Sequence, residues 1–503
     1  MRPEAETRFL TPAAHARKYA RWPELAAAGL TLALVAWLFL RQLGAQPLQL
    51  WDESRLALNA LNIGQRHDWL VMYYGRFPDS LNTKPPVMPI LQALSFAAFG
   101  FSTWALRLPA AVAGMLTAAG LLLFAWQVLR QPWAGIIAAL ALATMPGFNG
   151  YHVARTGEYD ALLALFTVGY ALSAYAYLRQ PRRRWLALFG GALAGALLVK
   201  CAAALLPLPA LLFYAGRYAP AALRERRVWL TGALAFAPLL LFYGLRELAY
   251  PGYLHFTWDN DWGGRVARPL TGATAWWYYL PALAQGLSGW GGALLLGGGL
   301  LFWSGLKVPA VARFALWQAA GLVLVASAAQ TRLPWYIAHA YPLLALAIGS
   351  AAVRLASRPP RRGPRAALLL TLLSLSGLAA GFDTLGRHRA AAAAPLAAFE
   401  QYGPALARLD RLPLPSPQVL VLYENYNPLL DFYRLTAPAP RRLVLDFQRL
   451  PRQQPEVGIA ELLPAQQVLG CLPRVRRLVE QRFATTPLAT LDSCWCLRLD
   501  RRR

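Results

Sequence analysis

Long apolar segments alternate with short polar ones along most of the chain. No Asp, Glu, Lys or Arg occurs in Leu25–Leu40, Leu108–Leu129, Ala161–Leu178 or Ala366–Ala380. An apolar segment of about 18 residues or more is long enough for a helix to cross the hydrocarbon core of a bilayer. The first segment follows a polar start and lacks a small-residue cleavage site, which indicates a span and not a signal peptide. The pattern therefore predicts an α-helical integral membrane protein.

We expect about 11–13 membrane-spanning helices, since segment boundaries are the least certain part of such an interpretation. The predicted spans lie near residues 24–43, 109–129, 132–148, 160–178, 185–199, 201–216, 229–247, 276–303, 313–331, 334–353 and 366–385. With the N-terminus in the cytoplasm, every second loop is cytoplasmic and rich in Arg or Lys, as the positive-inside rule requires. We therefore predict a multi-pass protein of the inner (plasma) membrane with a cytoplasmic N-terminus.

The opposite loops gather the acidic residues, at Asp52, Glu53, Asp68, Asp79, Glu158, Asp160, Asp259 and Asp261. The first of these loops, about 44–108, is much longer than a connection between two helices needs to be, and long ordered loops usually carry function. Its segment Pro85–Gly100 is apolar but contains three prolines, which favours an interfacial or re-entrant helix over a span.

The composition changes near residue 387. Residues 1–386 form the predicted transmembrane domain, and residues 387–503 are rich in Arg, Pro and Leu, with β-prone pieces at Val419–Tyr423 and Leu443–Phe447. We predict a small C-terminal α/β domain that the parity of the spans places outside the cytoplasm. In an oxidising compartment, Cys471 could form a disulfide with Cys494 or Cys496.

The balance of charge does not indicate nucleic acid. Hydrophobic residues make up 57 % of the chain and charged residues 15 %, with a formal net charge of +26. A soluble domain has nearer a quarter of its residues charged. The arginines stand in short blocks between apolar segments, which the orientation of membrane helices explains. We therefore expect membrane lipids as the surroundings and no nucleic acid as a partner.

Several cations are expected near the outer interface. Lys200 stands in the apolar stretch Leu186–Tyr214, where a cation costs roughly 2.5–3.5 kcal/mol and therefore marks a site or a paired charge. A lipid phosphate lies at that depth and is matched by Arg and Lys. The candidate phosphate-binding residues are Arg55, Lys84, Arg155, Lys200 and Arg332.

The outer-face carboxylates have two available roles. One can take a proton from an acceptor hydroxyl that attacks a sugar carbon, for which Asp52, Glu53 and Asp160 are candidates. Others can hold a divalent cation through oxygen ligands, with Asp52, Glu158 and Asp160 as the candidate set and the identity of the metal open. His152 is expected to be a packing or hydrogen-bonding residue.

The order of short motifs resembles that of the polytopic C-type glycosyltransferases of the protein-mannosyltransferase and aminoarabinose-transferase (glycosyltransferase 39-like) superfamily. The motifs are Asp52-Glu53-x-Arg55, Asp68-Trp69-Leu70, Lys84-Pro85-Pro86, Arg107-Leu108-Pro109, Arg155-Thr156-Gly157 followed by Asp160, Lys200, Trp277–Pro281, Leu333–Tyr336 and Tyr341-Pro342. The likeness covers roughly residues 20–350 and leaves the C-terminal region without a motif.

The resemblance implies transfer of a sugar from a polyprenyl-phosphate carrier to a glycolipid, cell-envelope glycan or protein acceptor at the outer face. It makes Asp52 the first candidate for the base or the metal neighbour. Two positions depart from the lipid A aminoarabinose transferases, which commonly have Glu where Thr83 stands and Lys where Arg332 stands, so a sister activity is expected. The alternatives are a flippase for lipid-linked sugars and a membrane scaffold, but polar residues gather on one face and the chain shows no related halves.

Overall fold

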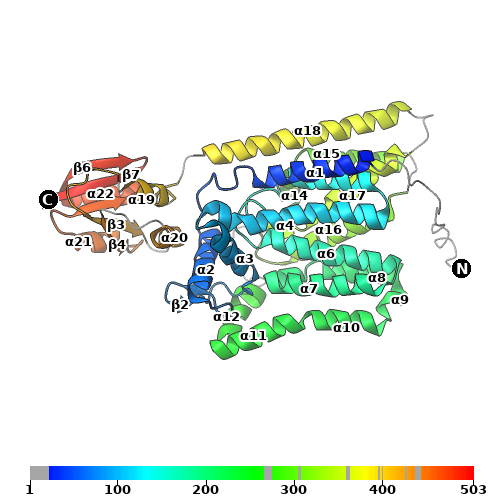
Figure 1. The fold of residues 1–503 in the computed structure, drawn as a ribbon, viewed down its shortest axis with the longest axis horizontal. Helices are drawn as coiled ribbons and strands as arrows, with labels where there is room; N and C mark the ends of the chain where they lie inside the picture. Colours follow the sequence, from blue (N-terminus) through cyan, green and yellow to red (C-terminus); the bar gives the residue numbers. More distant parts are fainter. Residues whose placement is uncertain are drawn as a thin grey trace.

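A computed structural model describes residues 22–264, 275–303, 307–357, 363–394, 397–398, 400–409, 411–424, 427–436 and 443–503. A bundle of long, roughly aligned helices makes up most of the molecule, and a small sheet extends from one end of it (Figure 1). The bundle consists of α1 (Trp22–Leu40), α4 (Thr103–Phe124) with η2 (Ala125–Leu129), α5 (Pro132–Thr144), α6 (Asp160–Arg179), α7 (Arg183–Ala204), α8 (Leu208–Tyr218), α9 (Pro220–Leu223), α10 (Arg226–Ala235), α11 (Ala237–Ala249), α14 (Tyr279–Leu287), α15 (Gly289–Trp303), α16 (Ala310–Ala328), α17 (Ala340–Ala356) and α18 (Gly363–Ala393).

The helices confirm the predicted fold class. Each predicted span overlaps one of these helices or a consecutive pair, but α7 continues to Ala204 and so crosses the boundary predicted between the spans 185–199 and 201–216. Within the described residues, six helical segments are long and apolar enough to cross a membrane alone, and shorter apolar helices accompany them. Turn chemistry sets several boundaries: Ser102 caps α4 by accepting a hydrogen bond from Ala105 N, and α5 begins with Pro132, whose missing N–H would be unpaired there in any case.

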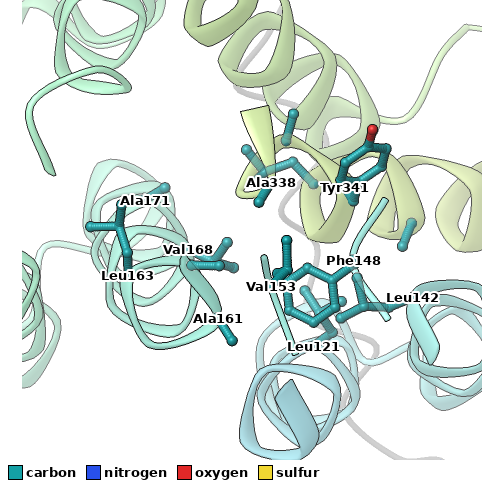
Figure 2. Close-up of a cluster of buried hydrophobic side chains, with 14 of the residues drawn as sticks. Leu121, Leu142, Phe148, Val153, Ala161, Leu163, Val168, Ala171, Ala338 and Tyr341 are labelled. Carbon is teal, nitrogen blue, oxygen red and sulfur yellow. The ribbon is translucent and has the colours of Figure 1, made fainter. Parts of the chain in front are cut away.

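The core of the bundle lies where α4, α5, α6 and α17 meet. Figure 2 shows Leu121, Leu142, Phe148 and Val168 lying together from α4, α5, the loop after α5 and α6, and Tyr341 of α17 belongs to the same buried cluster. Small residues let the helix backbones approach closely, since a Cβ at Gly349 would lie 2.1 Å from the Ala134 carbonyl oxygen. This rigid core holds the loop that carries several of the candidate site residues.

The first long loop folds against the end of the bundle nearest the sheet (Figure 1). It contains α2 (Asp52–Arg66), a hairpin of β1 (Tyr73–Tyr74) and β2 (Phe77–Pro78), and α3 (Val87–Phe99). The helix predicted in Pro85–Gly100 is therefore present as α3. Short helices from other connections complete the rim, namely α12 (Tyr253–Thr257), η3 (Trp258–Trp262) and η4 (Pro334–Ile337).

The C-terminal region is a mixed sheet with the strand order β4-β3-β5-β7-β6. It comprises α19 (Tyr402–Leu409), β3 (Gln418–Glu424), α20 (Pro428–Thr436), β4 (Val444–Leu450), α21 (Pro455–Ala460), β5 (Gln467–Gly470), α22 (Pro473–Arg482), β6 (Phe483–Leu491) and β7 (Cys494–Arg502). Both β-prone pieces predicted from the sequence are strands. Cys471 is bridged to Cys494, one of the two expected pairings, and Cys496 is a buried free thiol.

Helix α20 joins the sheet to the first long loop. Leu429 and Phe432 of α20 are buried in one cluster with Leu61 of α2 and Phe96 of α3. The hydroxyl of Tyr74 also donates a hydrogen bond of 3.3 Å to a carboxylate oxygen of Asp431. The C-terminal sheet is therefore docked on the loop that carries Asp52.

Candidate functional site

A cavity of about 390 Å³ lies at the rim of the bundle, between the first long loop and the ends of α6, α7 and α16. Six of the predicted site residues line it, namely Asp52, Arg55, Lys84, Glu158, Asp160 and Lys200. The remaining lining is largely apolar and aromatic, with Leu56, Leu163, Trp335 and Tyr336 among it. We call it the first cavity. It combines cations, carboxylates and an apolar surface.

Asp52 stands at the start of α2, where its side chain is exposed to the first cavity. The N-terminus of a helix favours a negative charge, because its backbone N–H groups lack partners within the helix. One turn later, Arg55 also lines the cavity, and its guanidinium donates to both carboxylate oxygens of Asp79 at 2.8 Å and 2.5 Å. Asp79 thus fixes Arg55 beside Asp52.

Lys200 and Asp160 form an ion pair across two bundle helices. Lys200 Nζ lies 2.8 Å and 3.1 Å from the two carboxylate oxygens of Asp160 and 5.4 Å from the ring centre of Tyr336. The break expected between two spans near this position lies within α7, where Lys200 has the non-helical angles φ −156° and ψ 72°. The distorted turn lets the lysine face the first cavity.

Lys84 enters the first cavity from the loop before α3. Its Nζ lies 3.8 Å from Asp261 Oδ1 and 5.4 Å from the ring centre of Tyr159. The hydroxyl of Thr83 donates a hydrogen bond to the other carboxylate oxygen of Asp261. Asp261 in η3 therefore holds both residues of the Thr83-Lys84 pair, so the carboxylate missing at position 83 has a counterpart from another loop.

Asp52, His152 and Glu158 form a compact group with one potential ligand atom each, all within 4.8 Å of one another. His152 Nδ1 lies 3.0 Å from Glu158 Oε2, yet this buried nitrogen makes no hydrogen bond of normal geometry. A nitrogen and two carboxylate oxygens are ligands that suit zinc and other first-row metals. His152 was expected to be a packing or hydrogen-bonding residue, and its spacing from Glu158 on one loop was the available signal for this group.

Burial and charge shift the titration of this pair. Burial raises the pKa of Glu158 to about 7, and the nearby charges of Asp52 and Glu53 act in the same direction while His152 opposes them. Burial alone would lower the pKa of His152, but the negative charge of Glu158, followed by Asp160 and Asp52, outweighs it and raises that pKa. The folded protein therefore holds the pKa of both groups above their ordinary values.

Glu53, a predicted catalytic carboxylate, is instead enclosed in the protein. Its two oxygens accept from Arg107 at 2.7 Å and 2.8 Å, from Gly157 N at 2.7 Å and from Gln49 N at 2.8 Å. Burial would raise the pKa of Glu53, but the Arg107 guanidinium and these hydrogen bonds lower it below its usual value. The carboxylate joins the first loop to the Arg155-Thr156-Gly157 motif, and it does not line the first cavity.

A second cavity of about 660 Å³ adjoins the first. Arg155 lies here and not with Lys84 and Lys200, because its guanidinium donates to the carbonyls of Leu38, Phe39, Arg41 and Gln42 at the end of α1. Those carbonyls have no partners within the helix, so the arginine caps it. Arg155 therefore lines a different cavity from Lys84 and Lys200, and its contact with a donor phosphate stays a prediction.

Arg332 has a comparable position at the end of α16. Its guanidinium donates to the Ser327 carbonyl at 3.2 Å and 3.0 Å, among other interactions. Its neighbours Thr331 and Leu333 line the first cavity, whereas Arg332 is absent from that lining. The residues on either side of Arg332 in the chain therefore line the first cavity, but the side chain of Arg332 does not.

Comparison with known proteins agrees with the predicted resemblance. Residues 83–243 match the family model described as dolichyl-phosphate-mannose-protein mannosyltransferase. No curated protein matches the chain by sequence. Among solved structures, ArnT from Cupriavidus metallidurans bound to undecaprenyl phosphate aligns with a TM-score of 0.70 and 18 % identity, over 94 % of this chain and 98 % of that one.

Oligosaccharyltransferases from Archaeoglobus fulgidus are similar over a smaller part of their length. The apo form aligns with a TM-score of 0.53 and 12 % identity, over 93 % of this chain and 74 % of that one. The archaeal AglB in complex with an inhibitory peptide and a dolichol-phosphate aligns with a TM-score of 0.51 and 14 % identity, over 84 % and 64 %. The bundle, its long first loop and the matched segment together confirm that this chain has the fold of the C-type, glycosyltransferase 39-like superfamily.

Proposed function

We propose that the protein is a glycosyltransferase that moves a sugar from a polyprenyl-phosphate carrier to an acceptor at the outer face of the membrane. The observation that carries the proposal is the lining of the first cavity, where Lys84 and Lys200 face the same space as the exposed Asp52. The similar protein from Cupriavidus metallidurans binds undecaprenyl phosphate. The apolar part of the lining is suited to the carrier's chain, and the cations are suited to its phosphate.

The cations act on the leaving group. Lys84, Lys200 and Arg55 are the proposed phosphate contacts, since all three line the first cavity. When the bond between the sugar C1 and the phosphate oxygen breaks, negative charge builds on the phosphate. Preorganised cations stabilise this charge more in the transition state than in the ground state, which raises the rate. Asp160 holds Lys200 in place for this role.

Asp52 is the proposed general base. An acceptor hydroxyl attacks C1, a new C1–O bond forms, and the hydroxyl proton passes to the carboxylate of Asp52. The polyprenyl phosphate leaves with the electron pair of the broken bond. We do not assign this role to Glu53, whose oxygens are occupied by Arg107 and two backbone N–H groups.

A divalent cation suits the same region. The proposed ligands are Asp52, His152 and Glu158, because their ligand atoms lie within 4.8 Å of one another and Nδ1 of His152, although 3.0 Å from Glu158 Oε2, makes no hydrogen bond of normal geometry. Asp160, a predicted ligand, is instead paired with Lys200. A bound cation would supply positive charge to the leaving phosphate. Asp52 would then orient the cation as well as the acceptor.

The second cavity is the proposed acceptor space. Its described lining contains Arg107, Arg155 and Arg387 and no Asp or Glu. Arg107 and Arg387 are paired with Glu53 and Asp383, so the excess positive charge of this cavity comes from Arg155. A positive space of this kind favours an acceptor that carries phosphate or carboxylate groups. We therefore favour an anionic glycolipid or cell-envelope glycan over a neutral peptide. The Arg-rich loops support a cytoplasmic N-terminus, and with it a position of both cavities outside the cytoplasm.

Binding of the carrier tests the donor site directly. Purified protein should be stabilised by polyprenyl monophosphate but not by the corresponding polyprenol, because the phosphate provides the charged contact. Lys84→Ala should weaken this stabilisation, whereas Lys307→Ala, at an exposed lysine that lines neither cavity, should not. Equal stabilisation by both lipids would contradict a phosphate site.

A further inference from the structure

Trp335 belongs to both cavities. It lines the first cavity beside Lys200 and Tyr336, and it lines the second beside Tyr151 and Arg155. It stands in the short helix η4, which begins at Pro334 and whose successive side chains point in directions about a third of a turn apart. Tyr336 can therefore lie under Lys200 while Trp335 separates the two spaces.

The indole is held by an aromatic contact from the opposite loop. The rings of His152 and Trp335 are stacked, with centroids 3.6 Å apart and planes inclined by 10°. Tyr151 packs edge-on against the same indole at 6.2 Å. His152 adopts a positive φ of 61°, a conformation uncommon for a residue with a side chain, and this turn presents its ring to Trp335.

Each side of this stack meets a different part of the site. His152 contacts Glu158, which lines the first cavity, whereas the adjacent Tyr151 lines the second. Trp335 is the one residue that the described linings of the two cavities share, so it stands where they adjoin.

We propose that Trp335, held by the ring of His152, is the partition between the donor and acceptor cavities and the residue that selects which acceptors reach the sugar. The proposal rests on the proposed function, because it takes the first cavity as the donor site. In this arrangement the indole keeps the bulk water of the second cavity away from C1 until an acceptor displaces the indole. Exclusion of water from a reactive donor prevents its hydrolysis.

A breach of the partition has a defined chemical consequence. Water, instead of the acceptor, attacks C1, a C1–OH bond forms, the C1–O bond to phosphate breaks, and the water's second proton passes to the site carboxylate. The products are free sugar and polyprenyl phosphate. The ratio of free sugar to transferred sugar is therefore a direct measure of how well the partition works.

Trp335→Ala should raise the ratio of free sugar to transferred sugar by about tenfold, because water can then reach C1 without an acceptor. The acceptor KM should rise while the donor KM stays within about twofold. Trp335→Phe keeps an aromatic ring and should restore most of the selectivity. The matched control is Trp317→Ala on α16, at a partly exposed tryptophan that lines neither cavity, and it should leave the ratio unchanged.

A second measurement does not depend on turnover. Cys201 is a buried free thiol that lines the first cavity, and Cys496 is a buried free thiol in the C-terminal sheet that serves as an internal reference. Trp335→Ala should speed alkylation of Cys201 by a charged, water-soluble thiol reagent relative to Cys496, as followed by mass spectrometry. Trp335→Phe should not.

The outcomes distinguish failure of the partition from failure of the proposed transferase function. If folded Trp335→Ala protein keeps both the hydrolysis ratio and the Cys201 rate of the wild type, the partition is overturned while the transferase remains. If the wild type neither transfers nor hydrolyses the donor, the proposed function is overturned, and the Cys201 rates still show whether Trp335 separates the cavities.

Discussion

Lys200 donates from α7 to both carboxylate oxygens of Asp160 at the start of α6, at 2.8 Å and 3.1 Å. The contact joins two helices that are each long and apolar enough to cross a membrane. It explains how a lysine is tolerated within an apolar segment, because a partner of opposite charge offsets part of the cost of burying it. It also fixes the cation that we place beside the leaving phosphate.

Removal of one partner of this pair should be more damaging than removal of both. Lys200→Met leaves Asp160 without its cation and should lower the free energy of unfolding by about 3–5 kcal/mol. The double variant Lys200→Met/Asp160→Asn should recover much of that stability. Thermal unfolding in detergent, analysed as a double-mutant cycle, measures the coupling.

Turnover should behave differently from stability in the same cycle. The double variant should remain at least about tenfold slower than the wild type, because the cation is absent from the phosphate site. Recovery of both stability and turnover in the double variant would restrict the pair to a structural role.

Asp52→Asn should remove turnover while leaving carrier binding intact. A placed base contributes on the order of 10²–10⁴ in rate, and the exposed carboxylate has little part in packing. Single-turnover kinetics with a labelled donor would measure the loss, and a binding assay with polyprenyl phosphate would serve as the control. Near-normal turnover would move the base to Glu158 or Asp160.

Glu53→Gln should act mainly on stability. The change leaves Arg107 without its carboxylate at a fully buried position, which costs on the order of 3–5 kcal/mol. Since the pKa of Glu53 is lowered in the folded protein, its stabilisation is present above its unfolded pKa of 4.5 and is lost as the pH falls through the folded pKa. Unfolding midpoints between pH 3 and pH 7 would show a steeper acid loss for the wild type than for Glu53→Gln.

The pair of His152 and Glu158 should make the metal-free protein less stable as the pH rises. The pKa of Glu158 is about 7, above its usual 4.5, and that of His152 is raised above 6.5. Both contributions are complete below the unfolded pKa values and are lost as the pH rises through the folded ones, by about 3 kcal/mol for Glu158. Unfolding midpoints measured in chelator from pH 4 to pH 8 should fall in the wild type and remain flatter in Glu158→Gln.

Metal binding should depend on the same three residues. In the presence of Zn²⁺ or Mn²⁺ at 100 times the dissociation constant, the folded state gains about 2.7 kcal/mol, and a chelator removes the gain. His152→Ala and Glu158→Gln should abolish the metal-dependent shift of the melting temperature, whereas Asp160→Asn should retain it. A shift that persists in His152→Ala would locate the metal elsewhere.

Much of the fold could be predicted because membrane helices are specified by local composition. The apolar segments indicated the helices of the bundle, and the prolines around residue 86 indicated a short helix, now α3, in place of a span. The docking of α20 on α2 could not be predicted, because it depends on Leu429 and Phe432 meeting a surface far away in the sequence. Such contacts carry no local periodicity.

The site could be predicted in part, because charged residues beside membrane spans are costly and therefore informative. Lys200 was selected in this way and Asp52, Lys84 and Asp160 from the outer loops, and the structure brings all four to the first cavity. The separate positions of Arg155 and Glu53 could not be seen, since a motif shows which residues stand together and not which carbonyl or guanidinium binds each one. The stack of His152 on Trp335 was missed for the same reason, as the two residues lie on different loops.

One measurement tests the central claim most directly. Purified protein in lipid vesicles is given a polyprenyl phosphate labelled in its sugar, together with an anionic glycolipid, a cell-envelope glycan or a peptide. We predict that the wild type moves the label to an acceptor and releases polyprenyl phosphate, and that Asp52→Asn does neither. Movement of the intact labelled lipid across the vesicle, with its bond between sugar and phosphate unbroken in every sample, would contradict the transferase and identify a flippase.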